Sequence, residues 1–259
     1  MKLPWIAGWL APVGLLVITC AAACRRTSAP ETQQPPTARA ASSQRAPGPE
    51  TPDADPHPTH DAGPSGYHMD FSHTQHFAAH FDDAGRDAWQ KPKHVLELLA
   101  IQPGARVVDL GAGTGYFVSV LSRAVGESGR VLAVDTERKM IEHLMKRSAE
   151  KRWRNVEARL VPADDPKLEA DSWDRILIVN TWHHIDDRAA YTRKLARGLK
   201  PDGILLIVDF TRESDIGPPL HHRLTADEVH AELRAGGLAA RIRDENLPKQ
   251  YVVSGTRVR

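Results

Sequence analysis

Seven short apolar segments after residue 100 of this 259-residue chain alternate with segments of helical periodicity. The segment Arg175–Val179 (RILIV) is apolar almost without interruption, which is typical of a parallel strand covered on both faces. We expect strands at 106–110, 131–134, 156–161, 175–179, 204–210, 239–243 and 251–256, and helices at 89–100, 116–125, 137–149, 188–199 and 226–235. This alternation predicts an α/β fold, a three-layer α/β/α sandwich around a mostly parallel seven-stranded sheet. The last two strands are too close for a helical crossover, so they should form an antiparallel hairpin.

The first 66 residues have a different composition. Nine of the nineteen prolines lie between Pro30 and Pro64, where aromatic and β-branched apolar residues are almost absent. Such a segment cannot bury enough apolar surface to offset its ordering entropy. We therefore predict a signal peptide or membrane anchor at 1–24, a disordered linker rich in Pro and Ala at 25–66, and one folded domain at 67–259.

The N-terminal segment has the features of an export signal: Lys2, a long apolar run, and small residues before Cys20 and Cys24. Both cysteines resemble the lipidated residue of a bacterial lipoprotein, and Ala22-Ala23-Cys24 fits the small-residue requirement better. The expected location is the cell envelope, with the membrane bound through an N-terminal lipid. An uncleaved inner-membrane anchor with a cytoplasmic domain is an alternative, because 3–23 is long enough to span a bilayer and two arginines follow it. Cleaved secretion is a third.

The charge pattern argues against a nucleic-acid partner. The formal net charge is +1 and charges of both signs are interspersed. A basic cluster between Lys146 and Arg154 is interpreted as the solvated face of a helix, with RNA binding as a less favoured alternative. The chain has two cysteines, Cys20 and Cys24, so the folded domain should contain no disulfide.

The stretch VVDLGAGTGYF (107–117) ends the first expected strand, at the sheet edge where ligands of such folds bind. A nucleoside triphosphate loop would need a lysine and a hydroxyl residue after the glycines, where Tyr116 and Phe117 stand. A dinucleotide loop would need a third glycine at the position of Tyr116. Asp109 would repel a pyrophosphate but would attract the ammonium and cationic sulfur of a sulfonium-bearing amino acid.

The motif D-L-G-x-G-x-G resembles motif I of class I S-adenosylmethionine-dependent methyltransferases, and four later segments resemble that family in the right order. Asp135 ends the second strand, Ala163-Asp164-Asp165 follows the third, 174–185 resembles the fourth-strand motif, and Leu199-Lys200-Pro201-Asp202-Gly203 resembles the turn before the fifth strand. The resemblance covers about 87–256. Segments 81–92 and 247–251 resemble exported bacterial members.

The resemblance implies a Rossmann-like fold, S-adenosyl-L-methionine as cofactor, and methyl transfer to an unidentified acceptor, which we expect to be a small molecule. It implies that Asp135 binds the ribose hydroxyls and that Asp164 lies near the adenine amino group. The predicted cofactor-binding residues are Asp109, Gly111, Ala112, Gly113, Gly115, Asp135, Thr136, Asp164 and Asn180.

His183 and His184 follow the fourth strand, at the expected mouth of the site. Either one could take a proton from a hydroxyl, an amine or an acidic carbon, and His184 is slightly preferred. Packing, or a hydrogen bond that shapes the loop, is the alternative role. Trp182, His221 and His222 are weaker candidates for the acceptor side.

Three functions are compatible with this sequence. The first is a methyltransferase. The second is a catalytically silent methyltransferase-like binding module at the envelope, because an exported domain would meet little of a donor made in the cytoplasm. The third, an NAD-linked oxidoreductase, depends only on the shared sheet architecture. His73, His76 and His80 could share one helix face, but we predict no metal site. The oligomeric state is left open.

Overall fold

The computed structural model describes residues 85–258 and contains one seven-stranded sheet with the order β3-β2-β1-β4-β5-β7-β6. Neighbouring strands from β3 to β5 are parallel, whereas β7 is antiparallel to both β5 and β6. The strands are β1 (Arg106–Leu110), β2 (Arg130–Asp135), β3 (Val156–Leu160), β4 (Trp173–Val179), β5 (Leu199–Phe210), β6 (Leu238–Arg243) and β7 (Gln250–Arg257). The predicted fold class and the C-terminal antiparallel pair are confirmed.

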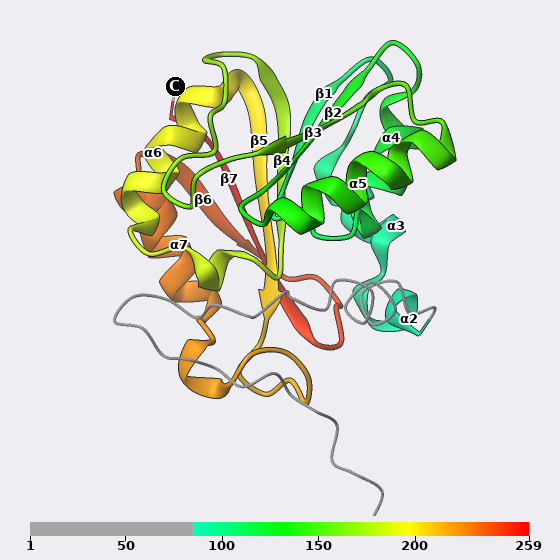
Figure 1. The fold of residues 1–259 in the computed structure, drawn as a ribbon. Helices are drawn as coiled ribbons and strands as arrows, with labels where there is room; N and C mark the ends of the chain where they lie inside the picture. The colour runs from blue at the N-terminus through cyan, green and yellow to red at the C-terminus, as the bar shows by residue number, and fades with distance from the viewer. Residues whose placement is uncertain (1–84, 259) are drawn as a thin grey trace, which may run out of the picture. The chain divides into compact units, whose positions relative to one another are not determined.

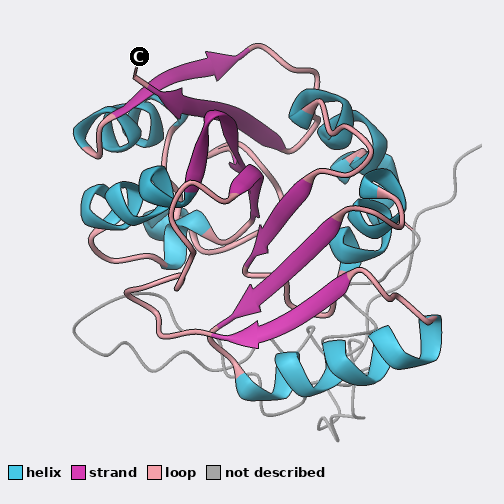
Figure 2. Cartoon of the chain, turned by 90° about the horizontal axis from the view of Figure 1, so that it is seen from above, coloured by secondary structure: helices cyan, strands magenta, loops and turns pink. Residues whose placement is uncertain are grey.

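Helices cover both faces of the sheet (Figures 1 and 2). The α-helices are α2 (Arg86–Gln90), α3 (Pro92–Leu99), α4 (Tyr116–Val125), α5 (Arg138–Lys151), α6 (Arg188–Gly198) and α7 (Ala226–Ala235); short 3₁₀ turns are η1 (Trp182–His184) and η2 (Leu220–His222). Apolar side chains of α3, α4 and α5 pack with Val107, Ala133 and Leu177 into one core. Those of α6 and α7 pack with Leu205 and Ile207 into the other core.

One expected helix is divided into two. The spacing of apolar residues predicted a continuous helix over 89–100, but α2 ends at Gln90 and α3 begins at Pro92. The proline ring disfavours right-handed helical geometry at the residue before it, and Lys91 adopts a left-handed conformation with φ 45°. Pro92 then takes the first position of α3, where its missing N–H leaves no helical bond unmade.

Several N-terminal predictions lie outside the described residues: the segments 1–24 and 25–66, the two cysteines, and the group His73, His76 and His80. Within 85–258, none of the helices has the length and apolar character needed to cross a membrane. In the same range, His, Cys, Asp and Glu side chains form no group of three or more that could hold a metal ion.

The central strands should dominate the stability of this domain. Leu177 of β4 is 0% exposed, whereas Ile242 of the edge strand β6 is 39% exposed. We expect Leu177→Ala to lower the free energy of unfolding by about 2–5 kcal/mol, because it leaves a cavity in the core. Ile242→Ala should cost less than about 1 kcal/mol. Urea unfolding of both variants measures the difference, and equal losses would contradict the assigned core.

Candidate active site

The polar residues of the predicted site follow strands whose carboxyl ends lie at one edge of the sheet. Asp109 of β1 pairs in register with Ala133 of β2 and Leu177 of β4, and Val179 of β4 pairs with Val208 of β5. Parallel register therefore brings the ends of β1, β2, β4 and β5 to the same edge, although the segments lie far apart in sequence.

The surroundings of the glycines between β1 and α4 differ from one position to the next. A Cβ on Gly111 would lie 2.3 Å from Oγ1 of Thr181, and a Cβ on Gly115 would lie 2.5 Å from a methyl group of Leu144. Close packing and a positive φ of 71° and 88° account for glycine at these two positions without a ligand. A Cβ on Gly113 would meet nothing within 4 Å, so this glycine leaves open space beside the turn. Gly113 is the position where a ligand can approach the backbone.

Asp135 fixes the glycine turn through its carboxylate. Its Oδ2 accepts the N–H of Gly113 at 2.8 Å, and its Oδ1 accepts the N–H of Glu137 at 2.9 Å. Burial raises the pKa of this carboxyl group, and backbone N–H donors, including those of Glu137 and Gly113, oppose the rise. Each carboxylate oxygen has a further lone pair, so Asp135 can accept hydroxyl groups while it holds the turn.

Asp109 is a second buried acid of the site with a raised pKa. Its side chain is buried, and its Oδ2 has no hydrogen-bond partner among residues 85–258. Burial raises its pKa to about 7; the charge of Arg86 opposes the rise and the charge of Asp135 adds to it. A buried carboxylate oxygen without a partner is costly, so this site favours a ligand that carries a hydrogen-bond donor or a cation.

Both predicted histidines lie in η1, and a buried carboxylate fixes the ring of His183. Nδ1 of His183 lies 2.9 Å and 3.0 Å from the two carboxylate oxygens of Asp209, at the end of β5. Both side chains of this pair are 4% exposed. The ring of His184 lies 4.2 Å from that of His183 between centroids. The geometry therefore favours His183 over His184, the residue that the sequence slightly preferred.

Asn180 has a left-handed conformation with φ 53°, and its side-chain amide belongs to a polar network. Gln90 Nε2 donates to Gln250 Oε1 at 2.6 Å, and Gln250 Nε2 donates to Asn180 Oδ1 at 2.5 Å. Asn180 Nδ2 completes the ring of three amides by donating to Gln90 Oε1 at 3.4 Å. This ring ties α2 to the end of β4 and to the start of β7.

The remaining predicted residues differ in their exposure and contacts. The side chain of Asp164 is 85% exposed, and its carboxylate lies 3.6 Å from Nζ of Lys194. Trp182 does not line the acceptor side as the sequence suggested, because its ring is 0% exposed in the core and its Nε1 donates to Glu232. The rings of His221 and His222 lie together in η2, 4.1 Å apart, in the loop after β5.

Ala112 and Thr136 are the two remaining residues of the predicted cofactor site, and both lie beside the residues described above. Ala112 is buried in the glycine turn, and its N–H donates to Val134 O at 3.1 Å. Thr136 follows Asp135 directly, and its backbone N–H helps to lower the pKa of that carboxyl group.

Three functional candidates were missed from the sequence: Arg86, Gln90 and Asp209. Asp209 had a signal, because it ends an apolar strand just as Asp109 and Asp135 end theirs. Arg86 and Gln90 had none, because their role depends on how α2 packs against the ends of β4 and β7.

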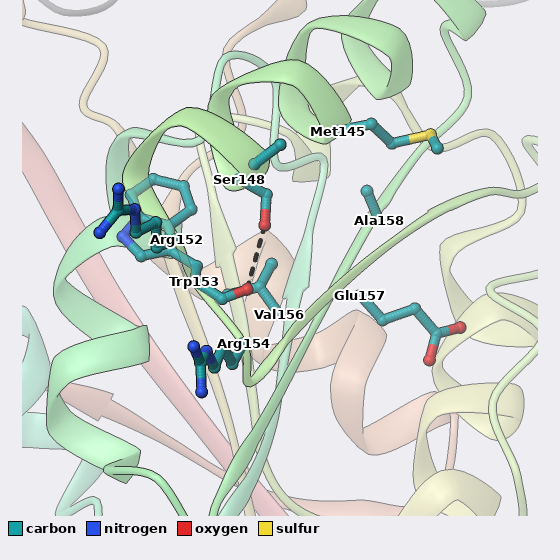
Figure 3. A pocket seen from close by; sticks show the side chains of 9 residues that line it. Met145, Ser148, Arg152, Trp153, Arg154, Val156, Glu157 and Ala158 are labelled. Carbon is teal, nitrogen blue, oxygen red and sulfur yellow. Dashed lines mark hydrogen bonds between the residues drawn. The ribbon is translucent and has the colours of Figure 1, made fainter.

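A hollow of about 580 Å³ lies elsewhere, between α5 and the edge strand β3 (Figure 3). Its lining includes Met145, Trp153, Arg152 and Arg154, and its acid, Glu157, bonds with Arg130 and Arg159. The hollow contains none of the predicted cofactor residues. A cationic ligand has no unengaged acid to pair with there, so we assign the cofactor to the glycine turn instead.

The sequence profile of the family described as "Methyltransferase domain" matches residues 101–251, more than half of the chain. The chain belongs to this methyltransferase family. The match includes the glycine turn, the strand-end aspartates and the segment with His183 and His184.

Curated relatives of this methyltransferase include ubiquinone/menaquinone biosynthesis C-methyltransferases. Those of Cronobacter sakazakii and Vibrio vulnificus are each 29% identical to it, over 154 and 149 residues. The alignments cover 58% and 57% of this chain, but only 59% and 56% of the relatives. The chain therefore spans less than two thirds of the length of these relatives.

Solved structures support the same fold. A SAM-dependent methyltransferase from Aquifex aeolicus is 27% identical, with a TM-score of 0.67 and coverage of 71% of this chain and 98% of that one. An S-adenosylmethionine-dependent methyltransferase from Mesorhizobium loti is 19% identical, covers 68% of this chain and 99% of that one, and has a TM-score of 0.53. The second likeness concerns the fold alone.

The cofactor of this methyltransferase is S-adenosylmethionine, and the site residues fit it. Asp135 presents carboxylate lone pairs for ribose hydroxyls, and Gly113 leaves the turn accessible. The buried, unpartnered Oδ2 of Asp109 suits an ammonium group. An acid with this burial would disfavour the pyrophosphate of a dinucleotide.

The raised pKa of Asp109 gives a stability prediction with a definite sign. The unfolded chain releases this proton near pH 3.8 and the folded domain near pH 7, so Asp109 destabilises the fold increasingly as the pH rises between these values. Asp109→Asn removes this effect. Relative to the wild type, the variant should gain up to about 3 kcal/mol in free energy of unfolding from pH 5 to pH 8.

Urea unfolding of both proteins at several pH values measures this gain. The comparison with wild type cancels the titration of groups that do not interact with Asp109, whereas Asp135 interacts with it and contributes to the difference. A stability difference that is constant from pH 5 to pH 8 would contradict the assigned burial of Asp109.

Proposed function

We propose that this methyltransferase acts on a small acceptor that loses a proton as it gains the methyl group, with His183 as the proton acceptor. The single observation that carries the proposal is the buried pair of His183 and Asp209 at the same sheet edge as the glycine turn. The favoured acceptor is a ring carbon activated by a hydroxyl group, as in a hydroquinone. The names of the C-methyltransferase relatives support this chemistry, at 29% identity.

The hydrogen bond to Asp209 determines which nitrogen of His183 can act. Because Nδ1 faces a carboxylate, the ring proton belongs on Nδ1 and the lone pair on Nε2. Asp209 also stabilises the positive charge that His183 acquires when Nε2 takes a proton. A second bond, from the backbone N–H of Phe210 at 2.9 Å, holds the Asp209 carboxylate in place. Asp209 is therefore a positioning residue.

Bound S-adenosylmethionine supplies a methyl group on a cationic sulfur, and the electron pair of the broken S–C bond stays on the sulfur. The acceptor atom provides the electron pair of the new bond to the methyl carbon. For a ring carbon or a hydroxyl oxygen, the proton of that acceptor group passes to Nε2 of His183. Because the leaving group needs no proton, the protein contributes mainly orientation and this one proton transfer.

Methyl transfer from labelled S-adenosylmethionine to a panel of hydroquinones, phenols and amines tests the proposal, with mass spectrometry to locate the methyl group. We expect a C-methylated hydroquinone. His183→Ala should lower kcat by about 10²–10⁴-fold, because general-base catalysis typically contributes that much. Asp209→Asn should lower kcat by at least about 10-fold. Binding of S-adenosylhomocysteine by both variants should change by less than about twofold.

His184→Ala is the matched control, because it removes the neighbouring imidazole. We expect kcat of this variant to remain within about fivefold of wild type. That loss is much smaller than the loss expected when a general base is removed. Equal losses of kcat in the His183 and His184 variants would assign the His183–Asp209 pair a structural role. So would a loss of cofactor binding that accompanies the loss of activity. Intact cofactor binding without transfer to any acceptor would favour the silent binding module.

We also propose attachment to the cell envelope through residues 1–24; of the attachments that the sequence allows, an inner-membrane anchor leaves the domain in the cytoplasm, where the donor is made. A hydroquinone acceptor with a lipid tail is consistent with that location, because the acceptor and the domain would then share one membrane surface.

A further inference from the structure

One side of the domain, formed by α5 and the edge strand β3, concentrates positive charge. Residues 138–159 hold eight lysine and arginine residues and three glutamates, whereas the whole chain has a formal net charge of +1. Two of these three acids already have partners: Glu150 pairs with Lys146 at 3.9 Å, and Glu157 bonds with two arginines. The cations of this side therefore outnumber the acids that could neutralise them, so the side attracts anions.

Three of these cations, at the end of α5 and just beyond it, are exposed. Among residues 85–258, the side chains of Lys151, Arg152 and Arg154 make no ion pair or hydrogen bond. The helix dipole explains a cation such as Lys151 in the last turn of α5, but Arg154 lies beyond the helix. In Figure 3 the guanidinium groups of Arg152 and Arg154 lie on the opposite side of the view from the carboxylate of Glu157. These cations are therefore open to an external anion.

Apolar side chains lie directly beside these cations. Arg152 and Arg154 line the hollow of about 580 Å³ together with Met145, Trp153 and Val156 (Figure 3). Met145 is 59% exposed. A single exposed apolar residue needs no explanation, but here the apolar lining and the exposed cations share one hollow. Such a surface matches a partner that has anionic and apolar parts next to each other.

A phospholipid surface has both parts, whereas a nucleic acid matches only the charge. Anionic headgroups attract lysine and arginine, and apolar and tryptophan side chains favour the boundary just below the headgroups. A nucleic-acid backbone would pair with the cations, and its bases would need an aromatic ring for stacking. The guanidinium carbon of Arg147 already lies over the ring of Trp153, 5.9 Å from its centroid. The aliphatic Met145 and Val156 have no counterpart in a nucleic acid.

This side of the domain also leaves the active site uncovered. Val156 is the first residue of β3, and the hollow lies at this end of the strand. The site lies at the carboxyl edge, where the last residue of β3, Leu160, pairs with Asp135 of β2. A domain held at the α5–β3 side is therefore compatible with entry of cofactor and acceptor.

We propose that the basic face, defined as Lys146, Lys151, Arg152 and Arg154 with the hollow beside them, docks on a membrane surface of anionic phospholipids. Headgroup phosphates pair with the cations, and Met145 lies against the apolar boundary beneath them. The contact is a second membrane signal in addition to residues 1–24, and it determines which side of the domain faces the bilayer. It is independent of the cofactor and of the acceptor.

Lysine footprinting of the full-length chain on vesicles tests the proposal. The rate of acetylation at each lysine, read by mass spectrometry, is compared between vesicles of phosphatidylcholine and vesicles of equal parts phosphatidylcholine and phosphatidylglycerol. On the anionic vesicles we expect Lys146 and Lys151 to react at least about threefold more slowly at about 0.1 M salt. The difference should disappear at about 1 M salt, where screening is strong. Lys93, exposed on α3, is the internal control and should react equally on both.

A triple variant removes the exposed cations and keeps one lysine as a reporter. With Lys151→Gln, Arg152→Gln and Arg154→Gln in one chain, Lys146 should react at the same rate, within about twofold, on both kinds of vesicle. All three positions are exposed, so the fold should tolerate the changes. Residues 1–24 are the same in both proteins and cannot cause the difference.

The matched control carries Arg193→Gln, Arg234→Gln and Arg241→Gln, which remove three exposed cations from α6, α7 and β6. It has the same change in net charge and should keep the slow reaction of Lys146. Equal rates on both kinds of vesicle in the wild type would overturn the proposal, and so would equal losses of protection in the two triple variants. Slowing of Lys146 by single-stranded RNA, without slowing by anionic vesicles, would assign the basic face to nucleic acid and overturn the proposal as well.

Discussion

The site depends on burying carboxylates at the ends of parallel strands. Asp109, Asp135 and Asp209 each end an apolar strand, and parallel register places all three at one edge of the sheet. Burying an ionised carboxylate is expensive unless it is hydrogen-bonded or paired. Two of the three have such partners: backbone N–H groups for Asp135, and His183 for Asp209. Asp109 keeps an oxygen without one, and its raised pKa reflects that cost.

The pleat of the sheet separates these carboxylates into two groups. Asp109 and Asp135 follow Val107 and Ala133, which belong to the core under α3, α4 and α5. Asp209 follows Ile207, which belongs to the core under α6 and α7. Side chains two residues apart on a strand point to the same face of the sheet. The carboxylates assigned to the cofactor and the carboxylate that holds His183 therefore lie on opposite faces, and both groups lie at the carboxyl edge. The glycine turn and η1 complete the site there.

Local sequence signals predicted most of the fold and part of the site. The apolar strands, the glycine turn and the C-terminal hairpin follow from residue patterns that act over a few positions, and the structure contains them. The break at Lys91 was missed because helical spacing outweighed the effect of Pro92. The Asp209–His183 pair and the amide ring could not be predicted, because each joins residues of elements that lie far apart in sequence and meet only once the order of the strands is known. The packing that requires glycine at positions 111 and 115 likewise could not be predicted, because it depends on where Thr181 and Leu144 lie.

The central claim is that the edge with Asp135 and Gly113 binds an adenosyl sulfur compound and not a dinucleotide. Calorimetric titration of the full-length chain with S-adenosylmethionine, S-adenosylhomocysteine and NAD tests it directly, beside Asp135→Ala and the exposed control Asp244→Ala. We predict dissociation constants of about 1 µM to 1 mM for both sulfur compounds. We expect Asp135→Ala, but not the control Asp244→Ala, to lower the affinity for both sulfur compounds by at least about 10-fold. We expect no binding of NAD. Binding of NAD, or undiminished binding of the sulfur compounds by Asp135→Ala, would contradict the account.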